Sequence, residues 1–154
     1  MEVYERISSY GRYLNNFSTI LFNLFGNEVT CIEEVNEDVN EIKVLVLKEN
    51  VLERVSFEPL GRTENMSYPL NVLCETYYLT DIVKIRKKFS YCPIDSEKEP
   101  DSLEMKIYFK NGDQIKVVAN SKNQHGDGYG FSFNADHYSD LKSFIGLLEE
   151  KNRL

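Results

Sequence analysis

Residues 103–119 read Leu-Glu-Met-Lys-Ile-Tyr-Phe-Lys-Asn-Gly-Asp-Gln-Ile-Lys-Val-Val-Ala, and this stretch decides the fold. Apolar and polar side chains alternate on both sides of Asn-Gly, which is typical of a β-hairpin. A two-residue loop would put the two apolar sets on opposite faces, because side chains alternate along a strand. A three-residue loop over residues 110–112 pairs Ile107 with Ile115 and requires a positive φ at Gly112.

The same register gives the hairpin one apolar and one polar face. It pairs Met105 with Val117 and Leu103 with Ala119 on the apolar face. The polar face carries Glu104, Lys106, Tyr108, Gln114 and Lys116. One wet face indicates an antiparallel sheet that is covered on one side only.

An amphipathic helix from about Asp136 follows and is expected to cover the apolar face. Its apolar stripe recurs at helical spacing and consists of Tyr138, Leu141, Phe144, Ile145 and Leu148. Lys151 and Arg153 lie at its end, where the helix dipole favours cations.

Residues 2–25 predict a further helix, which Gly26 can end. Its main apolar stripe is Val3, Ile7, Tyr10, Leu14, Phe17, Leu21 and Leu24. A second apolar face carries Tyr4, Tyr13, Ile20 and Phe22. Such a helix either packs on two sides or presents a contact surface, and docking on its own core is the simpler interpretation.

The chain between the two helices alternates short strand patterns with loops. Strands are expected over residues 28–35, 41–48, 51–57, 71–78, 81–90, 103–109 and 115–119, with a short one at 129–133. The predicted fold is α+β: an N-terminal helix, an antiparallel sheet or partly open barrel of about seven strands, and a C-terminal helix packed on it. At 154 residues the chain is expected to be a single domain, residues 1–154.

The predicted core follows from these patterns. It consists of Leu14, Leu21, Val44, Val46, Val83, Ile85, Ile107, Ile115, Val117, Leu141, Phe144, Ile145 and Leu148.

Composition and net charge reduce the number of possible functions. The net charge of −7 disfavours nonspecific binding to nucleic acid or to an anionic membrane. No segment reads as a secretory signal or as a membrane span, so a cytoplasmic protein is expected. Cys31, Cys74 and Cys92 show no disulfide or zinc spacing and are interpreted as small apolar residues in or near strands.

Residues 78–85, Tyr-Leu-Thr-Asp-Ile-Val-Lys-Ile, resemble the leucine-x-aspartate-isoleucine-x-x-isoleucine/valine strand of pleckstrin-homology-like domains. In those domains a strand pair with a glycine turn and a C-terminal helix follow, and residues 103–119 and 136–151 fall in that order. The resemblance covers residues 78–151 and implies a PH-like scaffold over residues 28–151 with a binding role. The lipid-binding members of the family need basic residues near the first strand turn, where this chain is acidic. In composition the chain is also similar to small proteins of low-GC Gram-positive bacteria.

Two charged segments are candidates for binding. Lys84, Arg86 and Lys88 would share one face of a strand, with Ile85 and Lys87 on the other, and could hold a phosphate or an acidic peptide. A solvated face, or an edge strand guarded by lysines against aggregation, explains the same pattern. The acidic run Glu33, Glu34, Glu37, Asp38 and Glu41 is typical of a solvated loop and could alternatively bind a cation or a basic partner.

The segment from His125 to His137 also contains Asp127 and Asp136, and these four residues suggest a metal site or acid–base chemistry. Its spacing fits no metal or nucleotide signature, and His137 is interpreted as a surface residue at a helix start. No cofactor and no metal are therefore expected.

Three functions remain open. The first is a noncatalytic protein-interaction module of a bacterial cytosolic protein, whose partner is another protein or a second copy of the chain. The second is an acidic inhibitor or immunity-type protein that binds a basic partner through residues 33–41. The third is a small enzyme that uses the His125–His137 region. We favour the first, with contacts through Tyr4, Tyr13, Ile20 and Phe22 or through Lys84, Arg86 and Lys88, and without nucleic acid or membrane.

Overall fold

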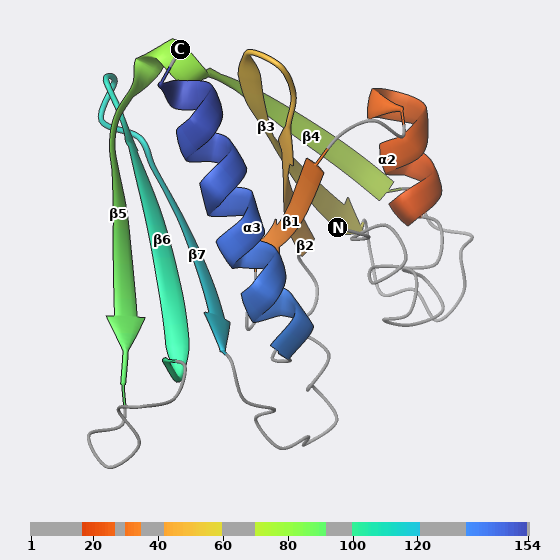
Figure 1. Ribbon diagram of the computed structural model, residues 1–154. Helices are drawn as coiled ribbons and strands as arrows, with labels where there is room; N and C mark the ends of the chain where they lie inside the picture. Colours follow the sequence, from red (N-terminus) through yellow and green to blue (C-terminus); the bar gives the residue numbers. More distant parts are fainter. Residues whose placement is uncertain are drawn as a thin grey trace. The chain divides into compact units, whose positions relative to one another are not determined.

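The computed structural model describes residues 17–26, 30–34, 42–59, 70–91, 100–120 and 135–153. Within these ranges the chain is α+β, with seven strands in two antiparallel sheets and helices on either side of them in sequence (Figure 1). The chain divides into two compact units, Met1–Thr76 and Tyr77–Leu154, called here the first and second unit. The prediction of one domain over residues 1–154 stays a prediction.

The division of the strands differs from the sequence-based expectation. The order β1-β2-β3-β4 forms one sheet and β5-β6-β7 another, so the described strands form neither a single sheet nor a closed barrel. The short 3-10 helix η2 (Leu79–Asp81) separates β4 from β5.

In the first unit, helix α2 (Phe17–Phe25) ends where the sequence predicted. Gly26 has φ of 79°, and its N–H donates to the Phe22 carbonyl at 2.7 Å, which closes the last turn. Leu21 is fully buried, as predicted, whereas Leu24 of the same apolar stripe is 49% exposed. The predicted helical residues 2–16, including Leu14, lie outside the described residues.

The four-stranded sheet is a simple meander of β1 (Thr30–Glu34), β2 (Ile42–Leu47), β3 (Val51–Pro59) and β4 (Leu70–Tyr78). β2 and β3 form a hairpin: Leu47 pairs with Leu52, and the Lys48 N–H donates to the Val51 carbonyl at 2.9 Å.

Both faces of this sheet are buried at its centre. One face contributes Ile32, Leu45, Leu47 and Leu52, and the other contributes Cys31, Val44, Val46, Val55 and Phe57. The near-continuous runs Ile42–Leu47 and Thr30–Ile32 suit this arrangement, because a strand that is buried on both faces needs no polar alternation.

The second unit contains β5 (Ile82–Ser90), β6 (Ser102–Phe109), β7 (Gln114–Asn120) and α3 (Ala135–Asn152). The predicted hairpin register is confirmed, since Ile107 pairs with Ile115, Met105 with Val117 and Leu103 with Ala119.

The hairpin turn has the three-residue form that the register required. The Gly112 N–H donates to the Phe109 carbonyl at 3.0 Å, and the Phe109 N–H donates to the Asp113 carbonyl at 3.0 Å. Gly112 has φ of 93°. The Asn111 side chain also accepts the Asp113 N–H at 2.9 Å, so both residues of Asn-Gly stabilise the turn.

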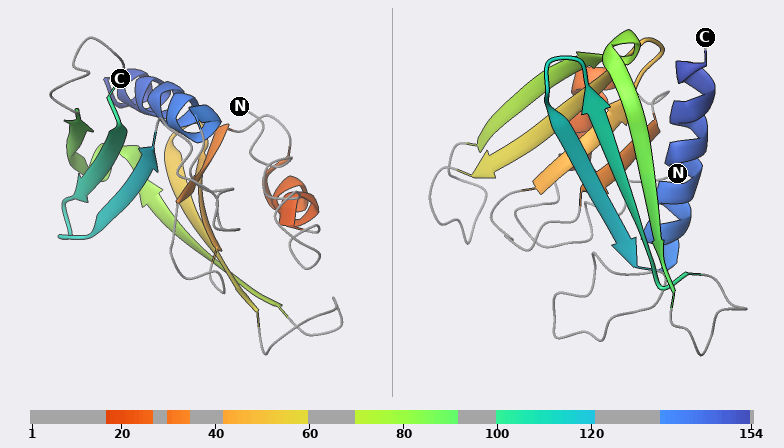
Figure 2. Two further views of the ribbon diagram at one scale, coloured as in Figure 1. Left: turned by 90° about the horizontal axis from the view of Figure 1, so that it is seen from below. Right: turned by 90° about the vertical axis from the view of Figure 1, so that its left-hand side faces the viewer.

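Helix α3 lies along one face of the three-stranded sheet and packs on β6, β7 and η2 (Figures 1 and 2). Its predicted stripe is buried in full: Tyr138, Leu141, Phe144, Ile145 and Leu148. The hairpin residues that alternate inward are buried as well: Leu103, Met105, Ile107, Phe109, Ile115, Val117 and Ala119. The helix was therefore correctly predicted as the cover of the apolar face.

A β-bulge changes the faces at the start of β5. Ile82 pairs with Phe109 and Lys84 with Tyr108, which leaves Val83 as an extra residue without a partner in the ladder. Val83 is 64% exposed, so its predicted burial is wrong, and Ile85 is only half-buried because β5 is an edge strand. The bulge puts Ile82 and Ile85 on the same face although three positions separate them.

The cysteines differ in their exposure to solvent. Cys31 is buried as predicted, but Cys74 is exposed on β4, and Cys92 lies outside the described residues. Partial burial, and then the carboxylate of Glu53, raise the pKa of the Cys74 thiol. This cysteine therefore has less thiolate near neutral pH than an ordinary cysteine.

Two glycines provide a matched test of the turn. No heavy atom lies within 4 Å of a Cβ added at Gly112 or Gly146, so a new methyl group clashes at neither position. Gly112→Val should cost roughly 1–2 kcal/mol because the side chain disfavours the left-handed backbone. Gly146→Ala should stabilise α3 by about 0.5–1 kcal/mol through helix propensity. Urea denaturation measures both changes, and a Gly112→Val variant as stable as the parent would contradict the argument.

Phe144 tests whether α3 is integral to the second unit. The side chain is fully buried, so Phe144→Ala should lower the free energy of unfolding by about 3–5 kcal/mol. Ser143→Ala, an exposed change on the same helix, is the control. A loss below about 1 kcal/mol for Phe144→Ala would mean that the helix is peripheral.

Candidate functional site

The face of the β5-β6-β7 sheet that does not carry the apolar core collects basic side chains; we call it the outer face. Alternation places five basic residues on it, Lys84, Arg86, Lys88, Lys106 and Lys116. The same face also carries Glu104, Tyr108 and Gln114. Lys84, Arg86 and Lys88 share this face as predicted, while Ile85 and Lys87 lie opposite Ile107 and Met105 on the other.

The register produces a line of like charges across all three strands. Arg86 of β5 pairs with Lys106 of β6, and Lys106 pairs with Lys116 of β7. We call these three residues the cation row. Directly opposed side chains in a sheet lie about 4.5–5.5 Å apart at Cβ, and like charges in that position destabilise the sheet.

One carboxylate offsets part of this charge. Glu104 Oε1 lies 3.2 Å from Lys116 Nζ, and among the described residues of the three strands Glu104 is the only acidic residue that alternation places on the outer face. The outer face therefore keeps a clear excess of positive charge.

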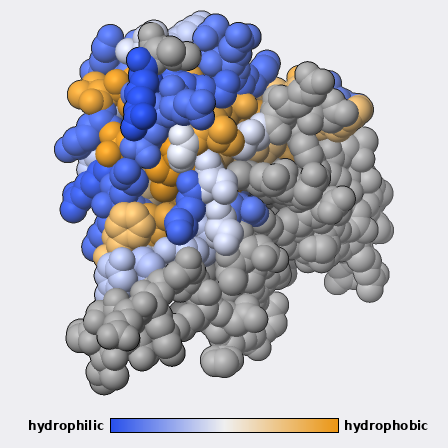
Figure 3. Space-filling view, in the orientation of Figure 1, coloured by the Kyte–Doolittle hydropathy of each residue, from blue (hydrophilic) through white to orange (hydrophobic). Residues whose placement is uncertain are grey.

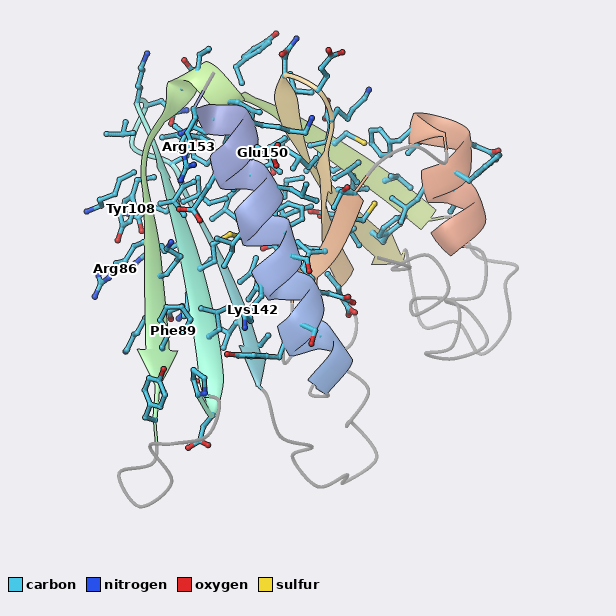
Figure 4. The ribbon with its side chains drawn as sticks, viewed as in Figure 1. Arg86, Phe89, Tyr108, Lys142, Glu150 and Arg153 are labelled. Carbon is cyan, nitrogen blue, oxygen red and sulfur yellow. The ribbon has the colours of Figure 1, made fainter. Side chains whose placement is uncertain are left out.

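Tyr108 lies beside the cation row, opposite Lys84. Lys84 Nζ is 4.4 Å and Lys106 Nζ 5.6 Å from the centre of the Tyr108 ring, both within cation–π range. A hydrogen bond from Arg86 lowers the pKa of the Tyr108 hydroxyl, and the charges of Lys106 and Lys84 lower it further. Figure 4 shows Arg86 and Tyr108 on the side of the sheet away from α3, which carries Lys142.

The other face of β5 is different in character. Lys87 Nζ lies 3.0 Å from Glu149 Oε2 of α3, so this cation is already paired within the fold. Phe89 is 45% exposed and Leu147 of α3 is 37% exposed. In the view of Figure 3, the coloured residues show apolar patches among mostly hydrophilic side chains.

Charge is unevenly divided along the sequence. Residues 1–76 carry 13 acidic and 6 basic side chains, whereas residues 77–154 carry 12 of each. The whole excess of negative charge therefore belongs to the first unit, and the cation row lies in the unit that is neutral overall.

The second predicted contact surface is described only in part. Phe22 is 52% exposed and Ile20 is half-buried on α2, while Tyr4 and Tyr13 lie outside the described residues. The role of this helix in partner binding stays a prediction.

The acidic run does not behave as the solvated loop that its composition suggested. Glu33 and Glu34 are 4% and 6% exposed, within β1. The Arg54 guanidinium donates to both carboxylate oxygens of Glu34, at 2.9 and 2.8 Å. The solvated-loop prediction is therefore wrong for these two residues, while Glu37, Asp38 and Glu41 lie outside the described residues.

The histidine region is likewise changed by the fold. His137 is fully buried, against the prediction of a surface position, because it lies one helical turn before Leu141 on the buried stripe of α3. His125 and Asp127 lie outside the described residues, as does the predicted strand over residues 129–133. Within the described ranges, no group of three or more His, Cys, Asp or Glu side chains could hold a metal ion.

No protein-family model, curated protein or solved structure matches the chain. Among the described residues, no helix has both the length and the apolar character that crossing a membrane requires.

Tyr108 gives a direct measure of the field on the outer face. Its hydroxyl should ionise below the ordinary value of 10.0, and Arg86→Gln should move its pKa back upward. Because the folded pKa is lowered, this group adds stability above the unfolded pKa and loses that contribution as the pH falls through the folded value. NMR titration of tyrosine labelled at Cζ, assigned with Tyr108→Phe, measures the shift. Lys87→Gln on the opposite face is the control and should change it far less.

Proposed function

We propose that the chain is a noncatalytic interaction module that binds an acidic segment of a protein partner on the outer face of β5-β6-β7. The observation that carries the proposal is the cation row, in which Arg86, Lys106 and Lys116 oppose one another across three strands. Opposed like charges lower stability, and an anionic partner would convert that cost into binding energy.

Protection of an edge strand does not account for the row. Lysines on an edge strand prevent unwanted pairing with other strands, which explains cations on β5. Lys106, however, belongs to β6, the central strand, where both sides are already paired. A cation between two other cations in the middle of the sheet therefore favours a binding role over protection.

The scaffold supports a binding module of the PH-like kind. In the segment that resembles the family, Leu79 is buried, and the Asp81 carbonyl accepts the Lys110 N–H at 2.9 Å. Tyr77 stacks on Phe109 with ring centres 4.3 Å apart. The hairpin and C-terminal helix follow in the order that the resemblance implies.

The chemistry of the described residues supports binding rather than catalysis. His137, the described histidine, is enclosed in the core, and the raised pKa of Cys74 works against a thiolate nucleophile. His125 and Asp127 lie outside the described residues, so the third possibility, an enzyme built on the His125–His137 region, stays a prediction.

The positive charge of the outer face favours an acidic partner. Two further features favour a protein over a nucleic acid or a membrane. Lys84 covers the Tyr108 ring, which works against the base stacking that single-stranded nucleic acids use. The overall charge of −7 repels long polyanions and anionic membranes. A short acidic segment of a protein remains the best match. A bacterial, cytoplasmic setting stays a prediction from the sequence.

Lys106 separates the two interpretations of the outer face. Lys106→Gln removes the middle charge of the row and should stabilise the protein by roughly 0.2–1 kcal/mol in urea denaturation. The same change should weaken binding of a Glu-rich peptide, measured by calorimetry, while Lys142→Gln on α3 should leave binding unchanged. Equal binding by Lys106→Gln and the parent would assign the row to an ordinary solvated face.

Self-association through α2 is a second candidate, which the exposed Phe22 favours. If the protein is a homodimer, Phe22→Ser should shift the monomer–dimer equilibrium, measured by analytical ultracentrifugation, toward the monomer. Leu147→Ser, a matched change at an exposed leucine of α3, should not. A homodimer that survives Phe22→Ser unchanged would exclude this helix from the interface.

The immunity-type alternative is weakened, because Glu33 and Glu34 are buried.

A further inference from the structure

The cation row places several hydrogen-bond donors side by side across three strands. Arg86, Lys106 and Lys116 are neighbours across strands, and Lys84 and the Tyr108 hydroxyl lie in the adjacent row. Long side chains whose Cβ atoms are about 5 Å apart can meet around a single group. The row therefore offers a concentrated site in addition to a generally basic surface.

The number of donors exceeds what one carboxylate needs. A single arginine can satisfy a carboxylate with two parallel hydrogen bonds, as Arg54 does for Glu34 in the first unit. On the outer face, Glu104 already engages Lys116, yet Arg86, Lys106 and Lys84 remain grouped around Tyr108. The surplus matches a ligand with more charge and more acceptor oxygens than a carboxylate.

A phosphate monoester has these properties. It carries about −1.5 to −2 charges near neutral pH and three acceptor oxygens. The guanidinium of Arg86 suits its geometry, the lysines supply charge, and the Tyr108 hydroxyl, while protonated, can donate a further hydrogen bond.

The column of cations along β5 indicates how the phosphoryl group would be presented. Lys84, Arg86 and Lys88 alternate along the strand, with a repeat of about 6.6–6.8 Å between successive side chains on one face. An extended peptide has the same repeat, so acidic residues that flank a phosphorylated side chain can meet successive cations.

We propose that the cation row of the outer face is a phosphate-monoester site that reads a phosphorylated residue in an extended, acidic protein segment. This inference rests on the proposed function and adds the chemical class of the ligand. The site lies on β5, β6 and β7, away in sequence from the acidic residues 33–41, where lipid-binding PH-like domains need their basic residues.

The test compares short peptides of alternating alanine and aspartate that differ at one central position, which is phosphoserine, glutamate or serine. Calorimetry at fixed ionic strength should show the phosphoserine peptide binding about tenfold or more tighter than the glutamate peptide. Lys106→Gln should abolish this preference, and Lys142→Gln should retain it. Inorganic phosphate, but not acetate, should raise the pKa of Tyr108, because a bound dianion disfavours the phenolate.

Each contrary outcome has its own meaning. Equal binding of the phosphoserine and glutamate peptides, both weakened by Lys106→Gln, would overturn the phosphate site and leave the proposed function intact. A phosphate preference that persists in Lys106→Gln would overturn the location. Failure of every peptide to bind would contradict the proposed function as well. Tighter retention by vesicles containing phosphoinositides than by the phosphopeptide would replace the protein segment with a lipid headgroup.

Discussion

The left-handed turn at Gly112 fixes the register of β6 against β7, and the rest of the second unit depends on that register. It places the inward side chains of both strands on one face, which α3 then covers. The same register puts Lys116 directly beside Lys106 on the outer face. A shift by one residue would reverse both faces, exposing the apolar set and burying the cations. The core and the candidate site therefore have a common cause.

The bulge at Val83 has a similar double effect at the edge of the sheet. Ile82 and Ile85 are separated by three positions, and a regular strand would point them to opposite faces. The extra residue lets both face the apolar side, and it sets Lys84 and Arg86 opposite Tyr108 and Lys106. Both isoleucines can therefore face the core from one strand only because the extra residue interrupts the regular pairing of β5 with β6. A bulge also protects an edge from pairing with other chains.

The two units differ in how far their charged side chains are neutralised by partners. In the first, Glu34 is buried and takes both its hydrogen bonds from Arg54, which makes it part of the sheet. In the second, the outer face carries several cations, and among the described strand residues only Glu104 accompanies them with a negative charge. A charge that the fold has already neutralised contributes little to binding, whereas an excess of one sign attracts a complementary partner. This contrast is why the basic strands, and not the acidic run, define the candidate site.

The sequence by itself determined the hairpin, its turn and the buried stripe of α3, because alternation, Asn-Gly and helical spacing are local signals. It also grouped Lys84, Arg86 and Lys88 on one face. Only the tertiary structure decided that Lys106 and Lys116 extend this group into a row, since strand pairing across β5 and β6 joins residues about 20 positions apart. Burial of Glu33, Glu34 and His137, the exposure of Val83 and the division into two sheets were likewise decided there. These depend on which elements meet in space, and no local pattern specifies that.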